Sequence, residues 1–198
     1  MPPHTPLLVE HRVNTLAHLR RVPPSRGVEV DVRDYAGDLR LVHDPLQSGE
    51  RLSDWLAAYQ HALLIFNVKC DGLEDRLIAL AAARNVSNFL FLDVANPTLV
   101  KLARRGERRV AVRYSEFEPL AFALAFAGQV DWVWIDTFTR LPLDPATHAA
   151  LAAHFKLCLV SPELQGHPRA RIADFRAQLA GLPLDAVCSD FCEDWAGA

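Results

Sequence analysis

Two carboxylates within residues 27–32 have the spacing that most directly predicts chemistry. Glu29 and Asp31 alternate with three valines. Because side chains alternate between the two faces of a strand, both carboxylates would share one face, about 6.6 Å apart. Oxygen ligands on one face can converge on a hard cation such as Mg²⁺ or Ca²⁺. The alternative is a strand face with two solvated acids, which is typical of an antiparallel edge rather than of a buried parallel sheet.

The apolar segment 63–68 ends on a second pair of polar residues that share a face. Asn67 can offer a carbonyl oxygen to a cation, and Lys69 a fixed positive charge to an anionic substrate. A lone lysine at a strand end is usually only solvated. Its pairing with Asn67, next to a strand that carries two carboxylates, favours a functional role.

Two histidines follow predicted strands in the same part of the chain. His11 follows the first strand, and His43 follows a predicted hairpin. Histidine titrates near neutral pH and is the commonest general acid or base. Beside a bound phosphodiester, such a pair could deprotonate a nucleophilic hydroxyl and protonate the leaving oxygen. A structural or surface histidine is the alternative for each, and we assign the other histidines to that class.

Short apolar, β-branched segments alternate with helical patterns along the whole chain. Residues 34–41, with Ala36-Gly37-Asp38 at their centre, predict a small hairpin. The predicted strands are residues 6–10, 28–32, 63–68, 89–92, 109–112, 130–135, 156–160 and 185–188. The predicted helices are residues 15–21, 52–60, 73–83, 97–105, 118–127, 145–154 and 170–180.

This alternation predicts parallel strands joined by helices, and eight such units predict a compact α/β TIM barrel, (β/α)₈. We expect a single domain over residues 1–198. A barrel usually takes about 250 residues, so the loops should be short. A doubly wound open sheet is the alternative. Barrel active sites gather at the carboxyl ends of the strands, where this chain places His11, Glu29, Asp31, Asn67, Lys69, Asp93, Arg113, Asp136, Glu163 and Asp190.

Composition and charge exclude several classes of function. The 198 residues carry a net charge of −3, which gives no basic surface for nucleic acid. No apolar run reaches the roughly 18 residues of a membrane span. The N-terminus, Met1 to Thr5, has neither the basic start nor the apolar stretch of a secretion signal, so we expect a cytoplasmic protein. The four cysteines lack a zinc-site spacing and are expected to be reduced.

The motifs of the first 70 or so residues resemble, in order, the signature of glycerophosphodiester phosphodiesterases. That family belongs to the phosphatidylinositol-phospholipase-C-like barrel superfamily, which also includes the sphingomyelinase D of spider venom. The matching motifs are His11-Arg12, Asn14-Thr15-Leu16, Glu29-x-Asp31, His43-Asp44 and the x-x-Lys ending at Lys69.

The resemblance implies a role for each of these residues. His11 and His43 would be the acid–base pair, and Glu29 and Asp31 metal ligands. Arg12 and Lys69 would hold the phosphate. The reaction would be attack on phosphorus by a substrate hydroxyl or by water, with a divalent cation polarising the phosphoryl oxygens. This implies an enzyme of lipid metabolism with a small-molecule phosphodiester as substrate.

Three departures from the family's pattern bear on this expectation. Asn67 stands where the family has a glutamate, so one anionic metal ligand is lost, unless Asp93 or Asp136 compensates. The usual Pro-Glu before Asn14-Thr15 is absent. Only residues 45–51 separate the His-Asp motif from the next helix, which leaves no room for the insertion of glycerol-specific members. The substrate could therefore be another phosphodiester or a sugar-linked phosphate.

Two further hypotheses stay open beside the phosphodiesterase. A barrel with a weakened metal site could bind a phosphorylated ligand without turning it over. A sugar-phosphate isomerase or aldolase could use Lys69 as a Schiff-base nucleophile. Arg113 is a candidate for a second anionic group, and Trp132 or Trp134 for stacking on a sugar, although packing is the commoner role of such tryptophans. A homodimer is left open.

Overall fold

The computed structural model describes residues 5–196, and the contacts within it divide the chain into two compact units. The N-terminal unit is Glu10–Leu102, and the C-terminal unit combines residues 5–9 with residues 103–196. Met1 to His4, on which part of the prediction about the N-terminus depends, lie outside the described residues. The single domain stays a prediction, and each unit is described by itself.

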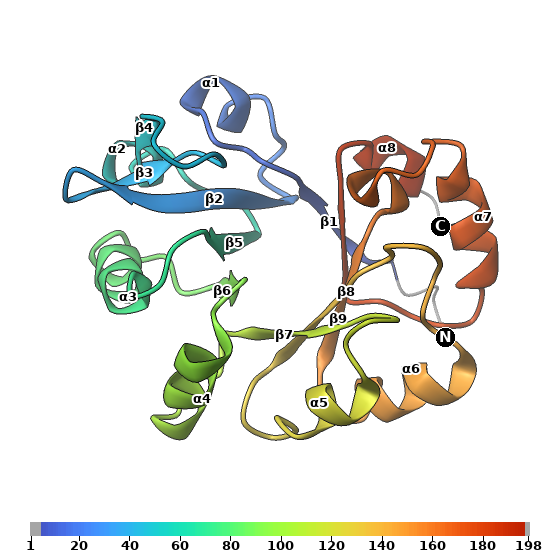
Figure 1. Ribbon diagram of the computed structural model, residues 1–198. Helices are drawn as coiled ribbons and strands as arrows, with labels where there is room; N and C mark the ends of the chain where they lie inside the picture. Colours follow the sequence, from blue (N-terminus) through green and yellow to red (C-terminus); the bar gives the residue numbers. More distant parts are fainter. Residues whose placement is uncertain (1–4, 197–198) are drawn as a thin grey trace. The chain divides into compact units, whose positions relative to one another are not determined.

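Three parallel strands form the centre of the N-terminal unit (Figure 1). Glu29 pairs in register with Ile65, and Asp31 with Asn67. Residues in register on neighbouring strands point to the same face. Asp31 and Asn67 therefore lie side by side. The strands are β2 (Gly27–Tyr35), β5 (Leu63–Val68) and β6 (Phe89–Leu92).

The predicted hairpin is confirmed. β2 turns through Ala36 and Gly37 into the antiparallel strand β3 (Asp38–Leu41). Both turn residues have positive φ, 53° and 84°, which is the backbone conformation of a tight two-residue hairpin. The short strand β4 (Glu50–Arg51), which the sequence did not predict, pairs with β3 and is followed directly by a helix.

The first two helices of this unit are shorter than their sequence patterns suggested. Thr15 caps the first of them, because its hydroxyl accepts the backbone N–H of His18 at 3.1 Å. Prolines 23 and 24 soon follow and prevent its extension. The helices are α1 (Leu16–Leu19), α2 (Leu52–Leu56), α3 (Glu74–Ala83) and α4 (Asn96–Arg104), which crosses the boundary between the units.

Aromatic rings on β5 and β6 form part of the core of the N-terminal unit. Phe66 lies 5.4 Å from Phe89 and 6.0 Å from Phe91 between ring centroids, and all three side chains are buried. Phe66 occupies the face of β5 opposite to that of Asn67, because strand side chains alternate. The face of β5 opposite to its polar face is therefore packed against other apolar side chains.

The C-terminal unit repeats the alternation of parallel strand and helix. Trp132 and Trp134 are both buried, which favours packing over an exposed stacking role. Its strands are β1 (Leu7–Glu10, whose last residue belongs to the N-terminal unit), β7 (Ala111–Tyr114), β8 (Trp132–Ile135), β9 (Lys156–Val160) and β10 (Ala186–Ser189). Its helices are α5 (Leu120–Leu124), α6 (Pro145–Ala152), the 3₁₀ helix η1 (Pro162–Gln165), α7 (Arg171–Gln178) and α8 (Cys192–Trp195).

The structure confirms the α/β class, because each predicted strand is present and the strands pair in parallel within each unit. The closed (β/α)₈ barrel stays a prediction. None of the helices within residues 5–196 combines the length and the apolar character that a membrane crossing requires.

The capping box of α6 yields a prediction on pH dependence. The Asp144 carboxylate accepts the backbone N–H groups of Ala146 and Thr147, and these hydrogen bonds hold the pKa of Asp144 below its ordinary 3.8. A lowered pKa in the folded state contributes stability above the ordinary pKa, and this stability is lost as the pH falls through the folded-state pKa. Asp144→Ala should therefore lower the Tm at neutral pH, by a difference that shrinks near pH 3. The control Thr147→Ser keeps the capping hydroxyl. A Tm difference independent of pH would contradict the prediction.

Candidate functional site

The two carboxylates of β2 are buried rather than solvated. Glu29 and Asp31 each have no exposed surface, and Asn67 is 8% exposed. One oxygen of each of these three side chains, Glu29 Oε1, Asp31 Oδ1 and Asn67 Oδ1, is buried without a hydrogen-bond partner among the described residues. Buried polar atoms normally have a partner. Three such oxygens on one face of two paired strands are therefore an unusual and informative feature.

The segment after β1 holds Asp31 in place through Asn14. The Asn14 amide donates to Asp31 Oδ2 at 2.8 Å, and the Asn14 carbonyl oxygen accepts the backbone N–H of Asp31 at 2.9 Å. Two cations also approach this carboxylate: Lys69 Nζ lies 3.4 Å from Oδ1, and Arg12 Nε lies 3.7 Å from Oδ2. Asp31 is thus the centre of the polar cluster.

Glu29 is held by the same segment. Its Oε2 accepts the backbone N–H of Arg12 at 2.8 Å, and Arg12 adopts a positive φ of 51°. Burial, together with the neighbouring Asp31, raises the pKa of Glu29, and His11 and the hydrogen bonds from Arg12 and Asn67 partly oppose this effect. His11 therefore lies within electrostatic reach of Glu29. A bound cation would favour the ionised carboxylate in the same way.

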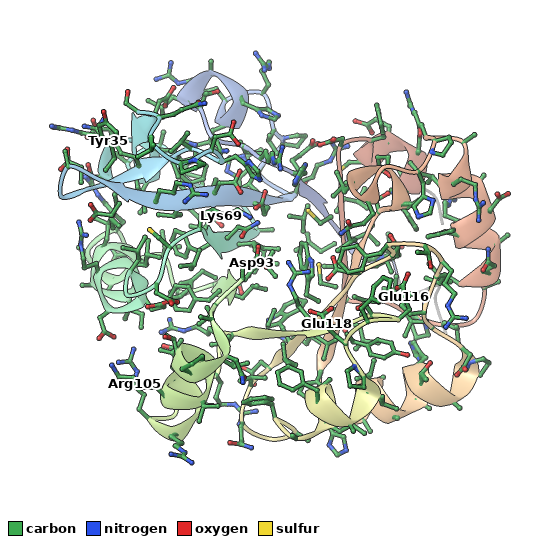
Figure 2. All side chains as sticks on the ribbon, viewed as in Figure 1. Tyr35, Lys69, Asp93, Arg105, Glu116 and Glu118 are labelled. Atoms are coloured by element: carbon green, nitrogen blue, oxygen red, sulfur yellow. The ribbon has the colours of Figure 1, made fainter. Side chains whose placement is uncertain are left out.

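Lys69 links β5 to the end of β6. Its Nζ donates to Asp93 Oδ2 at 3.1 Å, and the two side chains lie side by side in Figure 2. Asp93 follows Leu92, the partner of Asn67, so regular alternation would place its side chain on the opposite face. A positive φ of 61° at Asp93 breaks the alternation. Asp93 is consequently a partner of Lys69.

His43 follows β3 and is oriented by its neighbour. Its Nδ1 lies 2.8 Å from Asp44 Oδ1, and this hydrogen bond holds the pKa of Asp44 below its ordinary 3.8. With Nδ1 engaged, Nε2 is the ring nitrogen left to exchange a proton with a substrate. The Arg33 side chain joins this loop to the lysine, because it donates to the backbone oxygens of His43 and Lys69, each at 2.9 Å.

The residues present fit a divalent cation. Two carboxylate oxygens and one amide oxygen are hard ligands of the kind that Mg²⁺ and Ca²⁺ prefer. All three lack a hydrogen-bond partner in the described part of the chain. A cluster of three or more His, Cys, Asp or Glu side chains arranged for a metal is absent from residues 5–196. The third oxygen of the set comes from the amide of Asn67.

Arg113, the predicted site for a second anion, lies in the C-terminal unit and is engaged there. Its guanidinium donates to Asp136, whose other oxygen accepts the Gln165 amide at 2.8 Å. Asp136 is fully buried. It is therefore an anchor for Arg113 and Gln165 rather than a free carboxylate. The role of Arg113 toward a substrate stays a prediction.

Sequence reasoning gave Arg33 no role, and Asn14 only a place in the motif. Arg33 continues the alternation of Glu29 and Asp31 along β2, so the pattern already placed it on their face. The part played by Asn14 had no such signal. Its two hydrogen bonds to Asp31 join residues 17 apart in the chain.

The loop between His43 and β4 packs closely against β3 at Gly49. A Cβ at this position would lie 1.9 Å from the backbone oxygen of Leu41. Gly49→Ala should therefore displace the loop and lower the free energy of unfolding by about 1–3 kcal/mol, as overpacking does. Urea denaturation measures this. The matched variant Ser48→Ala adds no atoms there and should be nearly neutral; equal stability of the two variants would contradict the prediction.

The fold matches solved structures across almost the whole chain. A glycerophosphodiester phosphodiesterase from Agrobacterium tumefaciens str. C58 is 14% identical, with 98% of this chain and 100% of that chain covered and a TM-score of 0.69. A putative glycerophosphoryl diester phosphodiesterase from the same organism is also 14% identical, with 94% of each chain covered and a TM-score of 0.69. A glycerophosphoryl diester phosphodiesterase from Parabacteroides distasonis ATCC 8503 is 10% identical, with 99% of this chain and 86% of that chain covered and a TM-score of 0.68.

These matches show that the chain has the fold of solved glycerophosphodiester phosphodiesterases. The resemblance drawn from the motifs of the N-terminal unit is thereby confirmed at the level of the fold, for both units of the chain. Neither a protein-family model nor a curated protein matches the sequence.

Proposed function

We propose that the chain is a divalent-metal-dependent phosphodiester hydrolase of the glycerophosphodiester phosphodiesterase type. The observation that carries this proposal is a set of three buried oxygens, on Glu29, Asp31 and Asn67, that have no hydrogen-bond partner within residues 5–196. Lys69 lies beside them. The glycerophosphodiester phosphodiesterases that share the fold support the reaction class. We further propose that the strands close into a single (β/α)₈ barrel, the fold that the motif resemblance implies.

Glu29, Asp31 and Asn67 would hold the cation, which when bound polarises the phosphoryl oxygens. Lys69 and Arg12 would neutralise the anionic phosphate, and the Asp31 carboxylate fixes both side chains near the site. Arg12 is suited to contact with substrate, since about half of its side chain is exposed. Asp93 would keep Lys69 extended toward the phosphate.

His11 and His43 would divide the proton transfers. His11 would take the proton of the attacking water or substrate hydroxyl as that oxygen forms its bond to phosphorus. His43 would donate a proton to the leaving oxygen as the phosphorus–oxygen bond breaks and the electron pair stays on that oxygen. Asp44 supports this role of His43, because it accepts the Nδ1 proton and thereby leaves Nε2 to face the substrate.

The proposal is tested by activity on a chromogenic diester. The purified chain should hydrolyse bis(4-nitrophenyl) phosphate with Mg²⁺, Mn²⁺ or Ca²⁺, lose this activity in EDTA, and recover it when the cation is added back. Full activity after exhaustive chelation would contradict the metal dependence. Absence of activity with all three cations, on this substrate and on glycerophosphodiesters, would contradict the proposal itself.

A barrel that binds a phosphorylated ligand without turnover is the second candidate, and Asn67 favours it. Asn67→Glu should raise the affinity for Mn²⁺ at least tenfold, because an added anionic ligand strengthens a cation site. It should also lower the Tm in EDTA, since three carboxylates would then repel one another in a buried place. Calorimetry and thermal unfolding measure the two effects. Asn67→Gln is the control, because glutamine has nearly the size of glutamate without its charge. Equal Mn²⁺ affinity in the two variants would contradict the prediction.

A Schiff-base role for Lys69 has less support. Its amine contacts the carboxylates of both Asp31 and Asp93, and a nucleophilic amine would have to give up these contacts.

A further inference from the structure

An open cavity of about 490 Å³ lies beside His43 in the N-terminal unit. The predicted catalytic histidine and its partner Asp44 form part of its wall. This size falls within the range of small-molecule sites, roughly 300–1,000 Å³. The lining residues are Asn14, Thr15, Leu41, Val42, His43, Asp44, Gln47, Ser48, Gly49 and Glu50.

The wall of the cavity is held by backbone contacts on both sides. Gly49 packs against the backbone of Leu41, and its oxygen accepts a hydrogen bond from Arg40 at 3.2 Å. Glu50 pairs with Leu41 in the β3–β4 ladder, and its carboxylate accepts the backbone N–H of Leu16 at 2.7 Å. The residues between His43 and Gly49 therefore form a short loop that is anchored at its far end.

The charges on the lining disfavour an anionic ligand. Lysine and arginine are absent from the lining residues, so a second phosphate or a carboxylate would find no countercharge there. Both carboxylates in the wall are already engaged, Asp44 with His43 and Glu50 with the backbone of Leu16. An added anion would face these two negative groups, because Arg12 and Arg33, which act electrostatically on Asp44, lie outside the lining.

The lining also lacks the groups that recognise a quaternary ammonium ion. Such cations are bound by aromatic cages, and no aromatic ring other than the His43 imidazole lines the cavity. What the cavity does offer is the Gln47 amide and the hydroxyls of Ser48 and Thr15. These are uncharged groups that both donate and accept hydrogen bonds. Leu41 and Val42 add a small apolar floor that could face the carbon chain of a ligand.

We infer that this cavity receives the leaving alcohol of the phosphodiester, and that this alcohol is an uncharged polyol or sugar bound by Gln47 and Ser48. The inference rests on the proposed function, because it takes His43 as the group that protonates the leaving oxygen. A polyol held in the cavity would place its ester oxygen at the histidine while its other hydroxyls contact the loop. Gln47 and Ser48 would then determine specificity without taking part in the chemical step.

The test uses three diesters that share glycerol phosphate and differ in the leaving alcohol: glycerol, choline or 4-nitrophenol. With Mn²⁺ and the full chain, kcat/KM for the glycerol ester should exceed that for the choline ester about tenfold. For Gln47→Ala, we compare kcat/KM for the glycerol ester with kcat/KM for the nitrophenyl ester. This ratio should fall about tenfold, because one or two hydrogen bonds to the polyol are lost. Most of the fall should come from a higher KM for the glycerol ester. Ser48→Ala should show a smaller change in the same direction.

Leu46→Ala is the matched control. Leu46 belongs to the same loop, is 94% exposed and does not line the cavity, so this variant should keep the wild-type ratio. Three results would each overturn the inference: equal kcat/KM for the glycerol and choline esters, a preference for choline, or an unchanged ratio in Gln47→Ala. None of them would contradict the proposed phosphodiesterase function. If none of the three esters is hydrolysed with Mg²⁺, Mn²⁺ or Ca²⁺, the proposed function is overturned and this inference with it.

Discussion

Asp31→Asn should reduce diester hydrolysis about 10³-fold, the scale of loss when the electrostatic stabilisation of a transition state is removed. The substitution keeps the size of the side chain but removes the charge that both Lys69 and Arg12 approach. It also removes one of the two anionic ligands of the proposed cation. The variant should therefore lose affinity for Mn²⁺ as well as activity, and calorimetry measures this binding apart from turnover.

We expect the conservative change to leave the fold in place. Asn14 can keep both hydrogen bonds, because the backbone N–H of residue 31 is unchanged and the amide oxygen of the new side chain can accept the Asn14 amide. Asp71→Asn, at an exposed position on the loop after β5, is a matched control and should retain wild-type activity and Mn²⁺ affinity. A folded Asp31→Asn variant with unchanged Mn²⁺ affinity would show that β2 does not carry the cation site.

His43→Ala should have an effect that depends on the leaving group. General acid catalysis contributes about 10²–10⁴-fold, so hydrolysis of an ester with an alkyl alcohol should fall by about 10³-fold. An ester of 4-nitrophenol should lose much less, because nitrophenolate is stable enough to leave without a proton. Comparing kcat for the two esters therefore separates loss of the acid from loss of structure.

Two further variants complete this experiment. His154→Ala removes an exposed histidine of the C-terminal unit and should leave both rates unchanged. Asp44→Asn should show a weaker form of the His43→Ala pattern, since it disturbs the orientation of the ring without removing it. Equal losses on the two esters in His43→Ala would contradict the assignment of His43 as the acid.

Much of the fold could be predicted because strand and helix periodicities are local properties. The segments 63–68, 89–92 and 156–160 were predicted with the bounds that the structure has. Helix ends were less accurate: the predicted helix 52–60 ends at Leu56. An apolar pattern can continue past the last helical hydrogen bond, so composition does not mark that end.

The sequence was less informative about how polar groups pair. Asp93 reaches Lys69 only because its backbone turns through a positive φ, and Arg113 is engaged by Asp136 from the neighbouring strand. Neither pairing has a signature in residue spacing. Both depend on which strands become neighbours.

The sequence by itself determined that Glu29 and Asp31 share one face of β2, because side-chain direction along a strand follows from local backbone geometry. Only the tertiary structure decided that Asn67 lies in register with Asp31, that both are buried, and that an oxygen on each lacks a hydrogen-bond partner among the described residues. Register and burial arise from contacts between segments distant in the chain. Local periodicity cannot contain them.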